Sequence, residues 1–108
     1  MIEKRSQPRY LPRQPIPVVL QVGGKLVQGQ LGDISARGCL LLLPLVERPR
    51  YSQARTLMGE IDISQCDGHW EGEVTHHSAV RCHHGMGVRF AQSKSEIIEK
   101  LLASDGAG

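Results

Sequence analysis

The stretch from Leu31 to Leu43 constrains the fold more than any other part of this 108-residue chain, because it places a short polar turn between two apolar segments. Cys39–Leu43 is an unbroken apolar run that ends at Pro44. Neither face of such a strand suits contact with water, so we expect it to be central in a sheet or covered by another element. Asp33 and Ser35 are two positions apart, which places both side chains on one face of an extended backbone.

This polar turn has two interpretations. Asp, Ser and Gly are common β-turn residues, and Gly38 allows a positive φ before the next strand, so an ordinary structural turn explains the pattern. A binding loop on a rigid scaffold has the same composition. The turn alone does not decide between them.

The N-terminal segment presents arginines at intervals of four residues, at Arg5, Arg9 and Arg13. Prolines at positions 8, 12, 15 and 17 exclude a continuous helix, so we expect a flexible, extended or turning arm over residues 1–16. Arginine suits phosphate because its planar guanidinium donates two parallel hydrogen bonds, and it also stacks on bases. A basic arm that is simply solvated and disordered is the alternative interpretation.

Short apolar or alternating runs separated by turn signals predict six strands and one helix. The predicted strands are Pro17–Val22, Lys25–Ile34, Cys39–Leu43, Thr56–Ile63, His69–Val80 and His84–Phe90. From Ser93 onward, apolar residues at helical spacing predict an amphipathic helix, and a disordered tail follows at 104–108. The predicted fold is all-β with a C-terminal helix, a six-stranded antiparallel β-barrel over residues 17–103 that the helix plugs or flanks.

The charge distribution argues against DNA as a partner. The formal net charge is +2, of which the first thirteen residues contribute +3 and the remainder −1. A protein that coats duplex DNA needs a broad basic face, whereas this arm suits a ligand with two phosphates. No apolar run approaches the ~20 residues of a membrane span, and no signal peptide is visible, so we expect a cytoplasmic protein without membrane insertion.

The sequence does not predict an enzyme or a bound cofactor. It contains no nucleophile elbow, P-loop or paired-carboxylate signature. Its three cysteines form no C-x-x-C pair, which fits free thiols in a reducing compartment. A sparse set of candidate zinc ligands remains, but alternate strand residues face opposite ways and only some could converge, so no metal site is predicted: Cys66, His69, His76, His77, Cys82, His83 and His84.

Two motifs together resemble the PilZ domain family. The family's R-x-x-x-R is matched by Arg5-Ser6-Gln7-Pro8-Arg9, and its [D/N]-x-S-x-x-G by Asp33-Ile34-Ser35-Ala36-Arg37-Gly38. Gly85–Phe90 looks like the closing strand of the family, so the resemblance spans residues 3–102. It implies the same barrel and a receptor for cyclic di-GMP, a bacterial second messenger. The signal would pass to a partner protein through ligand-induced ordering of the arm, and a degenerate PilZ-like adaptor without nucleotide is the alternative.

The resemblance implies ligand-binding roles for seven residues. Arg5 and Arg9 would bind the phosphates and stack on guanine, while Asp33 would accept hydrogen bonds from the ring N–H and the amine of guanine. The other implied contacts are a cradle of Ser35 and Gly38 and auxiliary contacts from Arg13 and Arg37. Because the spacing of four occurs twice, the arginine pair is either Arg5 with Arg9, which the local context favours, or Arg9 with Arg13. The partner protein, the ligand stoichiometry and the oligomeric state, a homo-oligomer included, stay open.

Overall fold

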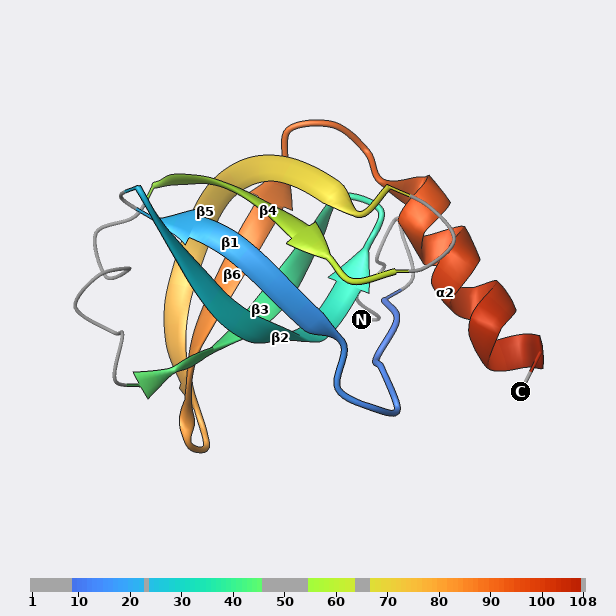
Figure 1. Cartoon of the computed structure of the whole chain (residues 1–108), viewed down its shortest axis with the longest axis horizontal. Coiled ribbons are helices and arrows are strands. Elements are labelled where there is room, and N and C mark those ends of the chain that lie inside the picture. Colours follow the sequence, from blue (N-terminus) through green and yellow to red (C-terminus); the bar gives the residue numbers. More distant parts are fainter. Residues whose placement is uncertain (1–8, 23, 46–54, 64–66, 108) are drawn as a thin grey trace, which may run out of the picture.

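The computed structural model describes residues 9–22, 24–45, 55–63 and 67–107. In these ranges the chain forms a barrel of six strands flanked by a helix (Figure 1). The elements are β1 (Pro17–Val22), β2 (Lys25–Ser35), β3 (Gly38–Pro44), β4 (Thr56–Ile61), β5 (His69–Val80), β6 (His83–Phe90) and α2 (Ser95–Ala107). All neighbouring strands are antiparallel, in the closed order β1-β2-β3-β6-β5-β4. The predicted six-stranded antiparallel barrel with a C-terminal helix is confirmed.

The core follows from the alternation of side chains along the strands. On β1, Val18, Leu20 and Val22 are buried while their neighbours are more exposed, as expected for a strand with one face on a core. The apolar β3 has Leu41 and Leu43 fully buried. Trp70 is also fully buried, and its ring centroid lies 5.8 Å from that of Phe90, so the two aromatic residues pack together inside the barrel.

Helix α2 closes one end of this arrangement (Figure 1). Its buried side chains are Ile97, Ile98 and Leu101, whereas Leu102 is half exposed, so the packed stripe is narrower than the predicted one. The amide of Lys94 donates to the carbonyl of Ala36 at 2.7 Å, which fixes the start of the helix beside the turn between β2 and β3. The amides of Ile97 and Ile98 in turn donate to the Lys94 carbonyl.

The helix also extends beyond its predicted end at residue 103, to Ala107. The sequence of this last turn, Ser104-Asp105-Gly106-Ala107, has no large apolar residue that would continue the helical spacing, so the pattern gave no reason to extend the helix. Once a helix is nucleated, each further residue adds a backbone hydrogen bond without needing tertiary contacts. No helix in the described part of the chain combines the length and the apolar character that a membrane span requires.

The described part of the N-terminal arm, residues 9–16, is attached to the barrel more firmly than the sequence predicted. The Tyr10 amide donates to the Ile34 carbonyl at 2.7 Å, and the Ile34 amide donates back to the Tyr10 carbonyl at 3.0 Å. The Tyr10 side chain is 9% exposed and belongs to the core. Tyr10 is therefore held in place within the arm, because it gains both a bridge to β2 and apolar burial.

Candidate functional site

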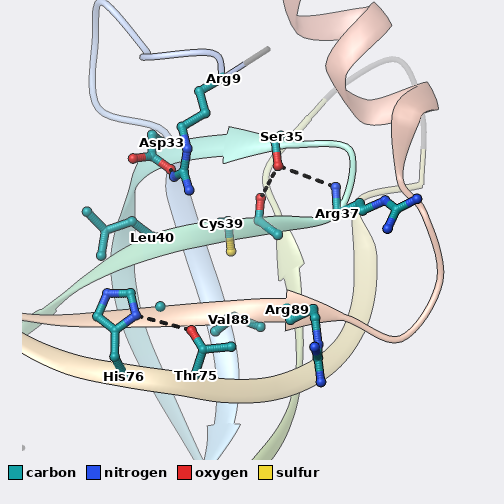
Figure 2. Close-up of a pocket in the computed structure, with 12 residues that line it drawn as sticks. Arg9, Asp33, Ser35, Arg37, Cys39, Leu40, Thr75, His76, Val88 and Arg89 are labelled. Atoms are coloured by element: carbon teal, nitrogen blue, oxygen red, sulfur yellow. Dashed lines mark hydrogen bonds and ion pairs between the residues drawn. The ribbon is translucent and has the colours of Figure 1, made fainter. Parts of the chain in front are cut away.

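The outer surface of the barrel is hollowed across β2, β3, β6 and β5 by a cavity of about 440 Å³. Five of the seven predicted site residues line it (Figure 2): Arg9, Asp33, Ser35, Arg37 and Gly38. The remaining lining residues come mainly from the neighbouring strands: Cys39, Leu40, Thr75, His76, Gly87, Val88 and Arg89. The two motifs of the sequence therefore meet in one place.

The strand register arranges the cavity as two parallel rows that run across four strands. The first row is Asp33, Leu40, Gly87 and His76, each paired with the next. The second row is Ser35, Gly38, Arg89 and Glu73. Directly opposed residues share one face of a sheet. Each row thus has polar side chains at its ends and a glycine near its middle, and the missing side chains at the two glycines help to hollow the surface.

A β-bulge in β2 places Asp33 and Ser35 in these rows. Leu31 pairs with Leu41 and Asp33 with Leu40, so Gly32 is an extra residue on β2. Without the extra residue, alternation from the buried Leu31 would direct Asp33 and Ser35 into the core. With it, Ile34 is fully buried and both polar side chains face the cavity.

A second bulge, in β5, completes the opposite wall. Val74 pairs with Val88 and His76 with Gly87, so Thr75 is the extra residue. Thr75 and His76 both line the cavity as a result, and the alternation resumes at His77, which is exposed and pairs with Met86. The two bulges lie on the two outer strands of the four that carry the cavity.

Arg9 and Asp33 form an ion pair at the rim of the cavity. Nη1 of Arg9 donates to Oδ1 of Asp33 at 2.7 Å, and the side chains are 45% and 18% exposed. The bridge between Tyr10 and Ile34 explains this contact, because Arg9 precedes one of these residues and Asp33 precedes the other. The burial of Tyr10 thus positions the arginine of one motif over the carboxylate of the other.

The turn at Ala36 and Arg37 is a tight connection organised by Ser35. The Ser35 hydroxyl accepts a hydrogen bond from the Arg37 amide at 3.4 Å and lies 3.5 Å from the Gly38 carbonyl, to which it donates. The expected positive φ at Gly38 is wrong, since Gly24 is the glycine with a positive φ among the described residues. Gly38 is needed for a different reason, namely that a Cβ there would collide with the carbonyl oxygen of Val88.

The floor of the cavity is apolar. Leu40 is half-buried between Asp33 and Gly87, and Cys39 lies below it with 5% exposure. Burial raises the pKa of the Cys39 thiol far above its usual value, and the negative charge of Asp33 raises it further. The thiol is therefore neutral and acts as a small apolar group in the floor.

Three arginines give the rim its positive charge. Arg9 is paired with Asp33, and Arg89 is paired with Glu73 through Nη2 and Oε1 at 2.5 Å. Arg37 is exposed and makes no ion pair with another described residue, and Figure 2 shows its side chain directed away from Asp33. An anionic guest would compete for all three guanidinium groups at a rim where one carboxylate, that of Asp33, lines the cavity.

The two other predicted arginines are not placed in the cavity. Arg13 is exposed and does not line it, while Arg5 lies outside the described residues. The weak zinc set also finds no support in the described part of the chain, where no group of three or more His, Cys, Asp or Glu side chains is placed to hold a metal ion. Cys66, a member of that set, lies outside the described residues.

Sequence reasoning missed the wall formed by β5 and β6. Gly87 and Arg89 belong to the segment that was identified as the closing strand, so their position was available but their role as lining residues was not. Thr75 and His76 reach the cavity because of the bulge in β5. The local sequence contains no signal that predicts this bulge. His76 was considered only as a weak metal ligand.

Comparisons with solved structures give the same fold. The PilZ domain of YcgR from Escherichia coli, determined with c-di-GMP, superposes with a TM-score of 0.71 at 15% identity, covering 93% of this chain and 87% of that one. The inhibitor of motility from Bacillus subtilis, MotI/DgrA, has a TM-score of 0.67 at 16% identity, over 95% of this chain and 50% of its own. The PlzA protein of Borreliella burgdorferi, in complex with c-di-GMP, has a TM-score of 0.63 at 16% identity, over 91% and 39%.

Two of these three relatives are thus considerably longer than the region they share with this chain. No curated protein matches the chain in sequence. The model of the PilZ domain family, however, matches residues 3–104, which include both motifs, all six strands and most of α2. Nearly the whole chain is accounted for by that one match, and the protein belongs to the PilZ domain family.

Proposed function

We propose that this protein is a receptor for cyclic di-GMP. The observation that carries the proposal is the meeting of Arg9, Asp33, Ser35 and Gly38 around one cavity, although Arg9 and Asp33 are 24 positions apart in sequence. Two structural neighbours, the YcgR domain and PlzA, were determined with c-di-GMP, which supports the same ligand class here. The function is one of binding and not of catalysis.

The donor and acceptor groups of the cavity fit a guanine nucleotide. The Asp33 carboxylate can accept from the ring N–H and the exocyclic amine of guanine, an edge that adenine does not offer. The guanidinium of Arg9, with Arg5 from the adjoining arm, can donate pairs of hydrogen bonds to phosphate and stack on a base. Ser35 and the backbone at Gly38 shape the cradle, and Arg37 is an auxiliary cation at its rim.

Binding requires Arg9 and Asp33 to exchange partners. Their ion pair is partly exposed, and exposed pairs contribute only about 0–1 kcal/mol. A charge-assisted hydrogen bond to the ligand is worth about 1.5–3 kcal/mol, and each of the two groups would gain at least one. The exchange is therefore favourable, with Arg9 moving to a phosphate and Asp33 becoming available to the base.

We propose that this exchange is also the signal. The arm is attached to β2 at Tyr10, so a pull on Arg9 and Arg5 would draw residues on the N-terminal side of that anchor across the cavity. An ordered strap over bound nucleotide presents a surface that a partner protein can recognise. A cavity lining that includes Arg9 and not Arg13 supports Arg5 with Arg9 as the pair of arginines.

Titration calorimetry with cyclic di-GMP, cyclic di-AMP and GTP tests the proposal. We expect binding of cyclic di-GMP with a dissociation constant below ~100 μM, a free energy more favourable than about −5.5 kcal/mol, and much weaker binding of the adenine analogue. If none of the three binds in this range, the receptor function is wrong and the adaptor alternative gains support.

A further inference from the structure

We infer that His76 is a specificity-determining residue of the cavity, which donates a hydrogen bond from Nε2 to O6, on the Hoogsteen edge of a guanine whose ring N–H and amine are held by Asp33. This inference rests on the proposed function and extends it to the β5 and β6 wall. The motifs of the arm and of β2 do not include this wall.

The register places His76 directly across the cavity from Asp33. The two residues end the same cross-strand row, with Leu40 and Gly87 between them. Three strand spacings separate their backbones, about 14 Å. Figure 2 shows the two side chains on opposite walls with Leu40 between them. A flat base that lies on this floor can present its ring N–H and amine to the carboxylate and the adjoining O6 and N7 edge to the imidazole.

Gly87 gives the His76 ring its place in the row. A Cβ on Gly87 would overlap the imidazole, with 2.5 Å to Nδ1 and a closer approach to Cε1. The ring therefore lies over the backbone of Gly87 on β6, along the surface of the barrel, and extends from β5 toward Leu40. The bulge at Thr75 is what directs it to this face at all.

Thr75 is the polar neighbour of the imidazole, and the direction of their hydrogen bond decides which ring nitrogen can donate to a guest. Its hydroxyl lies 3.2 Å from Nδ1 of His76. When the hydroxyl donates to Nδ1, the neutral ring carries its proton on Nε2, which becomes a donor. Guanine offers two acceptors, O6 and N7, on the edge away from the amine, whereas adenine has an amine in the place of O6. A donor at Nε2 therefore favours guanine and opposes adenine.

The variant that tests this role is His76→Phe, which keeps a flat ring over Gly87 and removes the hydrogen-bond donor. Its control is His69→Phe, because His69 is a partly exposed strand histidine outside the cavity. Titration of each with cyclic di-GMP and cyclic di-AMP should show about tenfold weaker cyclic di-GMP binding for His76→Phe alone, with reduced discrimination between the two ligands. Wild-type affinity and selectivity in His76→Phe would overturn the inference while leaving the receptor function intact.

Nitrogen NMR on the unmodified protein provides a test that does not depend on how the variant folds. The His76 ring should show a protonated Nε2 and an unprotonated Nδ1. Addition of cyclic di-GMP should shift the Nε2 signal. That signal is assigned because it is missing from the spectrum of His76→Phe, or by its connectivity to the backbone. An Nε2 signal that is unchanged at saturating ligand contradicts the inference. If no cyclic di-GMP binds at all, the proposed function fails first, and the inference fails with it.

Discussion

Nη1 of Arg9 lies 2.7 Å from Oδ1 of Asp33, so the N-terminal motif and the β2 motif contact each other directly at the rim of one cavity. The contact depends on the adjacent bridge between Tyr10 and Ile34, which joins the arm to the barrel. Each of the two charged groups is the other's partner in this structure. In the proposed function, a ligand with both phosphate and guanine replaces this pair.

Arg9→Ala should weaken cyclic di-GMP binding by about 10- to 150-fold, the equivalent of one charge-assisted hydrogen bond. Arg13→Ala removes the same charge from a residue that does not line the cavity, and should leave the affinity within about twofold. Calorimetric titration of both variants measures the difference. A larger loss in Arg13→Ala than in Arg5→Ala would show that the functional pair is Arg9 with Arg13.

Asp33→Asn should weaken binding of cyclic di-GMP by at least tenfold, because the amide offers one acceptor where the carboxylate offers two. The stability should change by less than ~1 kcal/mol, since the lost ion pair is partly exposed. Asp62→Asn is the control with the same charge change at an exposed position. Equal affinities of the two variants for cyclic di-GMP would show that Asp33 does not contact the ligand.

Tyr10→Ala should destabilise the fold by about 3 kcal/mol, because it removes a buried aromatic ring from the core. It should also weaken ligand binding, because Arg9 loses its anchor beside Asp33. Tyr10→Phe keeps the ring and should retain most of both. Urea unfolding followed by the fluorescence of the buried Trp70 measures the stability, and a Tyr10→Ala protein as stable as wild type would contradict the anchor.

Gly38→Ala should cost about 1–3 kcal/mol, because the new Cβ meets the backbone carbonyl of Val88 and the two strands must separate. The physical reason is close approach and not backbone conformation. Gly38→Ala should therefore also disturb the cavity, which urea unfolding and ligand titration can follow together. A fully stable variant would mean that β3 and β6 are not as close as described.

The two described cysteines should differ sharply in reactivity. Cys39 is buried and burial raises its pKa, so at pH 8 it stays a protonated, unreactive thiol, whereas Cys82 is exposed. In a Cys66→Ser protein, a thiol reagent should modify one cysteine in buffer and two in denaturant, with Cys82 as the first site by peptide mapping. Rapid modification of Cys39 in the folded state would show that the floor of the cavity is open.

The sequence predicted the barrel well because each strand carries its own signal. All six strands start at their predicted positions or within one residue of them, and β4 differs at its end, Ile61 in place of Ile63. β4 ends where its two neighbours begin: the Ile61 amide donates to the Gly68 carbonyl just before β5, and the Asp62 amide donates to the carbonyl of Pro17, the first residue of β1. Such contacts involve segments that are distant in sequence, so the end of a strand cannot be predicted from its own residues alone.

The cavity was predictable only in part, for the same reason. The face shared by Asp33 and Ser35 follows from a spacing of two, yet their outward direction depends on the extra residue Gly32. The opposite wall depends on a second bulge at Thr75 and on which strand lies beside β6. Barrel closure determines these positions, so His76 and Arg89 emerged only from the register.

The most direct test of this account is the set of backbone amide shifts in the two-dimensional NMR spectrum of the labelled protein as cyclic di-GMP is added. We expect the largest changes along the two cross-strand rows, at Asp33, Ser35, Gly38, Gly87 and His76, together with Arg9. A separate pocket, lined in part by Gln28, Gln30, Leu45 and Cys82, should be nearly unaffected. Shifts confined to that pocket, or no shifts at millimolar ligand, would contradict the account.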